Sequence, residues 1–250
     1  MFALIRFYLL LFTLLFSSFL HAKQELRVGV GNFPPFFIQE GDRGLFLDIT
    51  KAVFKLMPEY ELKFIFMSND RLVEEINTGL RIDVACNIFS GSKTIAYLSQ
   101  PLFRYTDVAV SKKENKLIIN QVSDLQNKSI SAYQGAVDLL GEEFKQMALA
   151  NGGYSENPYP SESTRLMAIG QKDVRVGDIN IFLYDINNDI YKKRINLNIS
   201  DFEIHQLWPD VFTHIAFKDE SIRDKANKAI LEIKNNGTLE RIYREYEARQ

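Results

Sequence analysis

Two consecutive series of strand and helix patterns limit what this chain can fold into more than any other feature of its sequence. The first series has three strand patterns separated by two helical ones, at 26–30, 45–57, 62–66, 69–79 and 82–88. A second series of the same kind occupies residues 129–176. Strand–helix–strand units place their strands in parallel and pack the helices on the sheet. We therefore predict an α/β protein of two lobes, each a mainly parallel sheet with flanking helices, with a cleft between them.

The first predicted strand, at 26–30, leads into a loop with two prolines and three aromatic residues. Proline cannot donate a hydrogen bond to a sheet and fixes its own backbone, so the strand must end before the prolines. Phe33, Phe36 and Phe37 then lie at the mouth of the strand, where open α/β sheets bind ligands. From the loop alone, the three rings either cover the end of a core or line a ligand site.

The N-terminal segment differs from the rest of the chain. Residues 7–20 are largely apolar, and Arg6 is the only Lys, Arg, Asp or Glu before Lys23. This apolar run is too short for an ordinary membrane span and suits the core of a secretory signal peptide. We predict a signal peptide at 1–22, cleaved after Ala22; an uncleaved anchor helix is the alternative.

The composition argues against several classes of protein. The chain has 30 Lys and Arg residues against 32 Asp and Glu residues, a net charge of −2, and no long basic block, so nucleic-acid binding is not predicted. Cys86 is the only cysteine, and its apolar surroundings predict a buried, unreactive thiol. The sequence has no H-E-x-x-H spacing and no phosphate loop, so no metal site and no cofactor are predicted.

Several short motifs, each weak alone, occur in an order that resembles one family. They include Phe33-Pro-Pro-Phe36, Gly44-Leu-Phe-Leu-Asp48, Leu98-Ser-Gln-Pro-Leu-Phe103, Asp173-Val-Arg-Val-Gly-Asp178 and Asn236-Gly-Thr-Leu-Glu-Arg-Ile-Tyr243. In order and spacing they resemble the periplasmic solute-binding proteins of the amino-acid type, bacterial extracellular solute-binding protein family 3. The resemblance extends over nearly all of residues 23–250.

This resemblance implies a type II periplasmic-binding-protein fold, in which a hinge of two strands lets two lobes close over a small ligand. It places lobe 1 at 23–107 plus 205–250 and lobe 2 at 108–204. It also implies a monomer in the periplasm, whose partners are a small-molecule solute and an ABC transporter permease in the inner membrane.

An amino-acid ligand in the presumed cleft needs an anion for its ammonium and donors for its carboxylate. The resemblance assigns the ammonium to Asp178, although the residue alone is better read as a helix N-cap or a solvated loop charge. Gly135 and Ala136 begin a predicted helix, whose free N–H groups and dipole suit an anion. An ordinary strand-to-helix turn is the alternative at this position.

The chain departs from the family pattern after its third strand. Relatives carry Thr or Ser, then a short loop, then an arginine that holds the ligand carboxylate; here the arginine is absent between Asn87 and Leu98. Ser90 fits the hydroxyl position. Lys93 lies close to the missing arginine, but lysine is a point charge without the planar fork, and it could equally be a solvated loop charge. These differences put an α-amino acid ligand in question.

Two aromatic positions of the family also bear on the ligand. Phe33 stands where relatives often place a stacking tyrosine, and Asn69 stands where many carry another aromatic residue. The complete set of predicted ligand-binding residues is Phe33, Asn69, Asn87, Ser90, Lys93, Gly135, Ala136 and Asp178.

Three functions remain open, of which solute capture for an ABC importer is the leading one. A ligand-sensing protein for a membrane receptor or signalling enzyme would use the same fold. Catalysis is the third, because a few proteins of this fold resemble lyases. We expect His205 and His214 to lie away from the predicted ligand residues, leaving no nucleophile–base pair. The sequence therefore predicts a binding protein and not an enzyme.

Overall fold

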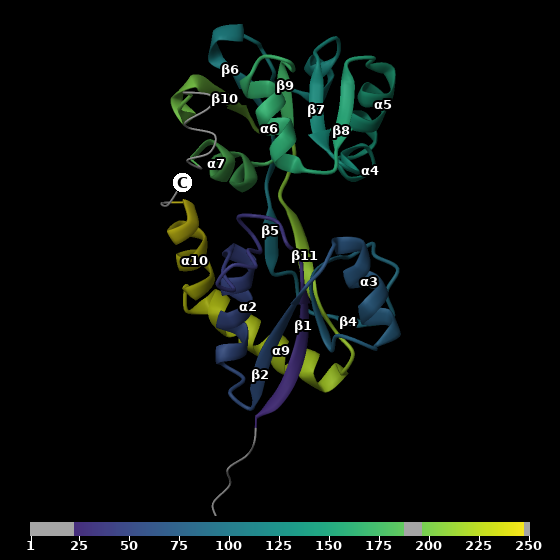
Figure 1. Ribbon diagram of the computed structural model, residues 1–250, viewed down its shortest axis with the longest axis vertical. Coiled ribbons are helices and arrows are strands. Elements are labelled where there is room, and N and C mark those ends of the chain that lie inside the picture. Colours follow the sequence, from purple (N-terminus) through teal and green to yellow (C-terminus); the bar gives the residue numbers. More distant parts are fainter. Residues whose placement is uncertain (1–22, 188–196, 248–250) are drawn as a thin grey trace, which may run out of the picture.

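The computed structural model describes residues 23–187 and 197–247. The predicted signal peptide, residues 1–22, lies outside these ranges and stays a prediction. The described chain forms two sheets, one in each of two lobes stacked along the long axis of the molecule (Figure 1). The two-lobed α/β architecture predicted from the sequence is confirmed.

The first sheet is built from both ends of the described chain. Its strands are Gln24–Val30 (β1), Tyr60–Phe66 (β2), Val84–Phe89 (β3), Tyr97–Leu98 (β4), Phe103–Tyr105 (β5) and Val211–Phe217 (β11). Their order is β2-β1-β3-β11-β4, and β5 also pairs with β11. The neighbours β1, β2 and β3 run parallel, whereas β11 is antiparallel to β3.

The second sheet has the order β10-β6-β9-β7-β8. Its strands are Asp107–Lys112 (β6), Ile130–Tyr133 (β7), Tyr154–Asn157 (β8), Val174–Asp178 (β9) and Phe202–His205 (β10). β7 is parallel to β8 and β9, whereas β6 is antiparallel to β9 and β10. Both sheets are therefore mixed, with a parallel set of three strands in each.

Helices cover both sheets. Those of the first lobe are Leu45–Lys55 (α2), Asn69–Thr78 (α3), Glu220–Asn235 (α9) and Thr238–Glu247 (α10). Those of the second are Lys113–Asn115 (η1), Val122–Leu125 (η2), Ala136–Leu139 (α4), Glu142–Ala150 (α5), Pro160–Ala168 (α6), Ile179–Asn187 (α7) and Ile199–Asp201 (η3), where η marks a 3₁₀ helix. No helix in these described ranges has both the length and the apolar character needed to cross a membrane.

The loop after β1 divides its three aromatic residues between the core and the surface. Phe36 and Phe37 are completely buried and pack beneath the loop. Phe36 stacks on Phe46 of α2 with ring centroids 4.1 Å apart and meets Tyr105 edge-on at 5.0 Å. Phe33 stays half-buried, edge-on to both loop phenylalanines at 5.9 and 5.6 Å. The loop is therefore anchored by two rings and presents the third.

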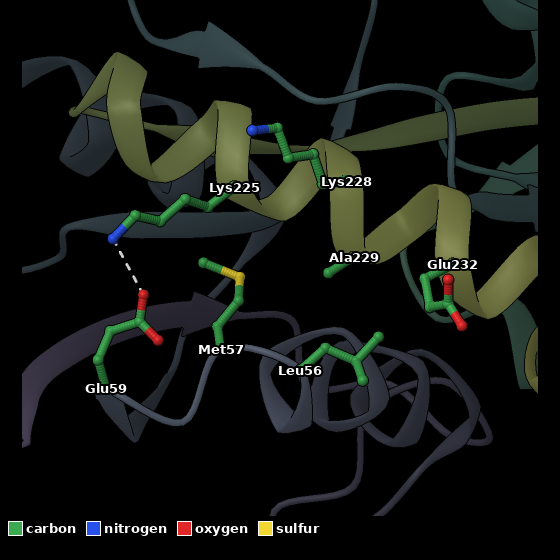
Figure 2. A pocket seen from close by; sticks show the side chains of 7 residues that line it. All are labelled: Leu56, Met57, Glu59, Lys225, Lys228, Ala229 and Glu232. Carbon is green, nitrogen blue, oxygen red and sulfur yellow. Dashed lines mark hydrogen bonds and ion pairs between the residues drawn. The ribbon is translucent and has the colours of Figure 1, made fainter.

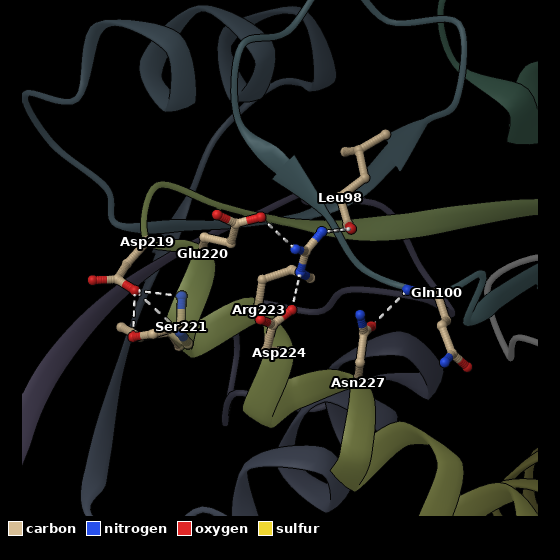
Figure 3. Close-up of polar contacts among 9 residues, drawn as sticks. Leu98, Gln100, Asp219, Glu220, Ser221, Arg223, Asp224 and Asn227 are labelled. Atoms are coloured by element: carbon tan, nitrogen blue, oxygen red, sulfur yellow. Dashed lines mark hydrogen bonds and ion pairs between the residues drawn. The ribbon is translucent and has the colours of Figure 1, made fainter.

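Polar contacts cap α9 and fasten it to the first lobe (Figure 3). Asp219 caps α9 by accepting from the N–H groups of Ser221 and Ile222 at 2.7 and 3.1 Å. Further along α9, Asn227 accepts a hydrogen bond from the N–H of Gln100 at 2.7 Å. Because the bond between Gln100 and Asn227 joins α9 to the loop beyond β4, α9 belongs structurally to the first lobe.

The chain crosses between the lobes twice. The first crossing is Thr106, between β5 and β6, and the second is residues 206–210, between β10 and β11. The hydroxyl of Thr106 donates to Asp210 Oδ1 at 2.6 Å, so the two crossings are joined to each other. The chain passes from one sheet to the other close to the predicted lobe boundaries. The exact division into 23–107 plus 205–250 and 108–204 stays a prediction.

Candidate functional site

The predicted ligand residues share one kind of position, because each follows or ends a parallel strand: Phe33 after β1, Asn69 after β2, Ser90 after β3, Gly135 after β7 and Asp178 at the end of β9. Parallel strands that point the same way end at one edge of their sheet, where α/β proteins bind ligands. Asp107, the first residue beyond the first crossing, is the cross-strand partner of Asp178. The two carboxyl edges therefore face each other across the crossing segments (Figure 1).

The edge of the first sheet offers an aromatic face and a polar loop. The half-buried ring of Phe33 leans on its loop neighbours and leaves part of its surface exposed. Asn69 is exposed as the first residue of α3, and the cap position belongs to Ser68 instead. The side-chain amide of Asn69 therefore has no capping role.

Asn87 is the least satisfied polar residue on the first edge. It is 3% exposed, and its Oδ1 accepts from the hydroxyls of Tyr105 and Thr213, both at 2.9 Å. Its Nδ2 has no hydrogen-bond partner within the described chain. Leaving such a group buried and unpaired costs about 1–3 kcal/mol, so it calls for an explanation. A ligand oxygen beside Asn87 would provide one.

Ser90 and His214 form a pair that the sequence analysis did not predict. Ser90 Oγ lies 2.8 Å from Nε2 of His214, and Nδ1 of the same ring lies 2.7 Å from the carbonyl oxygen of Ser99. Because a carbonyl can only accept, Nδ1 carries the hydrogen, and in the neutral ring Nε2 accepts from the serine hydroxyl. The expectation that His214 lies away from the ligand residues is wrong. The pairing of β11 with β3 brings His214 opposite Ile88, close to Ser90.

Lys93 belongs to the exposed loop that follows β3. Its backbone carbonyl accepts a hydrogen bond from Asn77 Nδ2 of α3 at 2.9 Å. This bond ties the loop to the side of the lobe and leaves the lysine side chain in solvent. A solvated loop charge therefore describes Lys93 well, and its ligand role stays a prediction.

Asp178 is a buried N-cap. Its Oδ1 accepts from the N–H groups of Asn180 and Ile181 at 2.7 and 3.3 Å, at the start of α7. Its Oδ2 accepts from the N–H of Thr106 in the first crossing at 2.8 Å. Burial, and then the nearby charge of Asp107, raises the pKa of Asp178 to about 7. Asp178 therefore holds the lobe junction together, and one acceptor position on Oδ2 remains for a ligand.

Asp107 is a second acidic residue at this edge, and the sequence analysis missed it. It lies opposite Asp178 in the antiparallel pairing of β6 and β9. The hydroxyl of Tyr133 donates to its Oδ2 at 3.2 Å, which leaves most of its acceptor capacity unused within the described residues. Burial raises the pKa of Asp107 to about 6. The sequence signal was its place at the lobe boundary, but only the strand register brings the two carboxylates together.

The helix start predicted to bind an anion already holds one. Glu156 of β8 accepts from the N–H of Gly135 at 2.7 Å through Oε2 and from that of Val137 at 2.9 Å through Oε1. The hydroxyl of Tyr154 donates to the same carboxylate at 2.6 Å. Ala136, between the two donors, is completely buried. The electrostatics predicted at this turn are present, but a side chain of the protein uses them.

The arginines nearest to these edges make other contacts. Arg175 is 1% exposed, and its guanidinium donates to Thr164 Oγ1 and to the carbonyl oxygens of Gly177 and Asp178 at 3.0 to 3.2 Å. The guanidinium of Arg104 lies over the ring of Tyr243, 4.4 Å from its centroid.

Arg71, at the start of α3, pairs with Glu75 at 3.3 Å. Each of these arginines is thus engaged with the protein itself.

A separate groove of about 430 Å³ lies on the outer surface of the first lobe (Figure 2). The ion pair between Lys225 of α9 and Glu59, 2.9 Å long, crosses it. Leu56 and Met57, at the end of α2, form its apolar floor. The groove contains none of the predicted ligand residues, so it is not the candidate site.

Cys86 is buried beneath α2, where its Sγ lies 3.5 Å from the hydroxyl of Thr50. The burial predicted from the sequence is confirmed. Burial also raises the pKa of the thiol to about 12, which disfavours the reactive thiolate. Within residues 23–187 and 197–247, no group of three or more His, Cys, Asp or Glu side chains is arranged to hold a metal ion.

The described chain thus has two α/β lobes, two crossings between them, and polar side chains at facing carboxyl edges. This architecture is that of a two-lobed solute-binding protein of the type II periplasmic-binding-protein fold. The model of the bacterial extracellular solute-binding proteins, family 3, matches residues 26–249. The chain belongs to this family, and the resemblance drawn from its motifs is confirmed. No curated protein sequence matches the chain.

Solved structures share this fold over most of their length. An ancestral arginine-binding protein bound to glutamine is 26% identical, with a TM-score of 0.66 over 90% of this chain and 99% of its own. The amino acid ABC transporter substrate-binding protein AbpA from Streptococcus pneumoniae, bound to L-arginine, is 19% identical, with a TM-score of 0.67 over 90% and 95%.

A histidine kinase sensor domain with similarity to periplasmic binding proteins is 15% identical, with a TM-score of 0.68 over 90% and 96%. For these last two structures, at 19% and 15% identity, the likeness concerns the fold alone. The family and these relatives are described as binding or sensor proteins.

Proposed function

We propose that this protein captures a small polar solute in the periplasm by closing its lobes, and delivers it to an ABC importer. The observation that carries the proposal is the pair of facing carboxyl edges, linked by the short crossings at Thr106 and 206–210. Short linked crossings allow one lobe to rotate as a rigid body toward the other, which buries a ligand held between the edges. The closed state then presents a new surface to the permease.

The ligand, in this proposal, lies between Phe33, Asn87 and Ser90 on the first edge and the Asp107–Asp178 pair on the second. The amide of Asn87 supports it, because a ligand group would complete its hydrogen bonds: an acceptor facing Nδ2, or an N–H facing Oδ1 if the amide is turned. Asn69 supplies an exposed amide at the entrance. The other three predicted residues contribute less. Lys93 is exposed to solvent. Glu156 already accepts from the N–H groups on either side of Ala136, those of Gly135 and Val137.

Sensing is the second candidate function, and the shared fold of the histidine kinase sensor domain favours it. A sensor would use the same lobe closure to signal to a membrane receptor or enzyme in place of a permease. Both functions place a monomeric protein in the periplasm after removal of a signal peptide at 1–22. The two functions predict different effects of deleting the protein: a transport protein leaves the cell without uptake of the solute, and a sensor leaves it without the response to the solute.

A thermal-shift screen of the purified protein against amino acids, amines, organic acids and small sugars tests ligand capture. A ligand that binds the folded state raises the melting temperature by mass action, and lobe closure lowers the radius of gyration measured by small-angle X-ray scattering. No ligand in any class, together with an unchanged radius, would refute the proposal. With a ligand in hand, a deletion strain that loses uptake of the labelled solute supports transport. Unchanged uptake with a lost transcriptional response supports sensing.

A further inference from the structure

We infer that the ligand of this site is a small organic cation without a carboxylate, such as an amine or a guanidinium compound. The inference rests on the proposed function, because it takes the facing carboxyl edges as the ligand site. Two observations carry it. The protein's own side chains already occupy the groups that would bind a carboxylate, and the buried carboxylates of Asp107 and Asp178 remain to bind a cation.

The first group is the start of α4. A ligand carboxylate there would have to displace Glu156, whose two oxygens bond the N–H groups of Gly135 and Val137 at 2.7 and 2.9 Å. Glu156 is tethered to the neighbouring strand and is held further by the hydroxyl of Tyr154. A tethered group competes at a high effective concentration, so a free carboxylate is at a disadvantage.

The second group is the hydroxyl of Ser90. Its hydrogen points to Nε2 of His214, because the carbonyl of Ser99 fixes the hydrogen of the neutral ring on Nδ1. Ser90 therefore has lone pairs, and no hydrogen, to offer a ligand. A hydroxyl in this state accepts from an ammonium or guanidinium N–H and cannot donate to a carboxylate.

The third group is the set of nearby cations. The guanidinium of Arg175 donates into the backbone around Asp178, that of Arg104 covers Tyr243, and that of Arg71 pairs with Glu75. Lys93 lies in the solvated loop. A ligand carboxylate would thus meet no guanidinium fork among the described residues at these edges, which is the partner that binds carboxylates best.

The anions, in contrast, are ready for a cation. Asp107 and Asp178 lie opposite each other, 7% and 3% exposed, and the charge of Asp107 adds to the burial that raises the pKa of Asp178. A cation placed against both would relieve this repulsion and form charge-assisted hydrogen bonds. Asn87 fits a cation when its amide is turned by 180°. Its Nδ2 then donates to the hydroxyl oxygens of Tyr105 and Thr213, and its Oδ1 accepts from an N–H of the ligand.

Charged and titratable groups around the acidic pair come from several elements. Arg175 on β9 attracts both carboxylates, and the rings of Tyr133 on β7, Tyr105 on β5 and Tyr243 on α10 pack close by. Asp185 on α7 faces Arg175 from the other side. Since Arg175 is already shared with Asp185, the acidic pair keeps an unbalanced negative charge when ionised.

Calorimetric titration with matched ligand pairs tests the inference. Agmatine and arginine, putrescine and ornithine, and cadaverine and lysine differ within each pair only by the α-carboxylate. We expect the decarboxylated member of at least one pair to bind about tenfold or more tightly than its amino acid. If the amino acids bind equally well or better, or if an acid or a sugar binds instead, the inference is overturned while the proposed function stands. If no solute binds and the lobes do not close, both fail.

A charge-removing variant separates ligand selection from simple structure. Glu156→Gln removes the resident anion at the start of α4, so we expect the preference for agmatine over arginine to fall by about threefold or more. The matched control is Glu142→Gln, an exposed position on α5, which should leave the preference unchanged. A Glu156→Gln protein with a lower melting temperature and an unchanged preference would contradict the selective role of Glu156.

Discussion

The two facing carboxyl edges have opposite chemical characters. The edge of the first sheet is neutral, with the half-buried ring of Phe33, the amide of Asn87 and the hydroxyl of Ser90. The edge of the second carries the buried carboxylates of Asp107 and Asp178. In the proposed site, the first lobe would therefore set the shape of the ligand pocket, and the second would select the charge of the ligand.

The largest effect we predict concerns what supports the neutral edge. Phe36→Ala should lower the free energy of unfolding by about 3–5 kcal/mol, because a fully buried aromatic side chain leaves a cavity. Phe33→Ala should cost less than half as much, since its ring is only half-buried, yet it should weaken ligand binding. Urea denaturation of both variants measures the difference. Equal losses of stability would show that Phe33 is core and not a ligand contact.

The acidic edge is tested by Asp107→Asn, which keeps the shape and removes one charge. We expect a cationic ligand to bind about a hundredfold more weakly, because a buried charge-assisted hydrogen bond becomes a neutral one. Calorimetry at neutral pH measures this loss. The matched control is Asp138→Asn, on the exposed side of α4, which should not change affinity. A small loss in Asp107→Asn, equal to that of the control, would place the cation elsewhere.

The same edge should make stability depend on pH. Burial raises the pKa of Asp107 to about 6 from its ordinary value of 3.8, so between these two pH values the native state holds a proton that the unfolded state has lost. Its contribution to stability is complete below the unfolded pKa and is lost as the pH rises through the folded one.

Compared with Asp107→Asn, the ligand-free wild-type protein should therefore lose about 1 kcal/mol of stability between about pH 5 and pH 7.5. Denaturation of both proteins across this range gives the difference. His205 acts with the opposite sign, because burial lowers its pKa, but it is present in both proteins and cancels. A difference that stays constant with pH would contradict the burial effect assigned to Asp107.

The smallest predicted effect belongs to the Ser90–His214 pair. Ser90→Ala removes one acceptor for the ligand, and we expect cation affinity to fall by about threefold to tenfold. The half-buried Ser92, two residues further along the loop, provides the control variant Ser92→Ala. Cation affinity that stays unchanged or rises in Ser90→Ala would show that the hydroxyl does not accept a hydrogen bond from the ligand, against the geometry described.

Much of the fold followed from local sequence patterns. The strand at 26–30 ends where the prolines require it, and Gly79 ends α3 in the left-handed backbone conformation, with φ of 73°. These features depend on residues close together in the chain, so hydrophobic periodicity and turn chemistry were enough to predict them.

The site was less predictable, because its contacts join distant parts of the chain. Ser90 and His214 are 124 positions apart, and no local pattern indicates their meeting. Asp107 meets Asp178 through the register of two strands, and Glu156 reaches Gly135 from the next strand. The sequence could suggest an anion site at Gly135 from its helix start, but not which anion would fill it.

A crystal structure of the protein with agmatine tests the central claim most directly, because it locates the charge of the ligand. We predict a guanidinium or ammonium nitrogen about 3 Å from the carboxylate of Asp107, with Glu156 still bonded to the N–H groups of Gly135 and Val137. The same experiment with arginine should show no complex under the conditions that give the agmatine complex. A structure in which the carboxylate of arginine replaces Glu156 at the start of α4 would contradict the account.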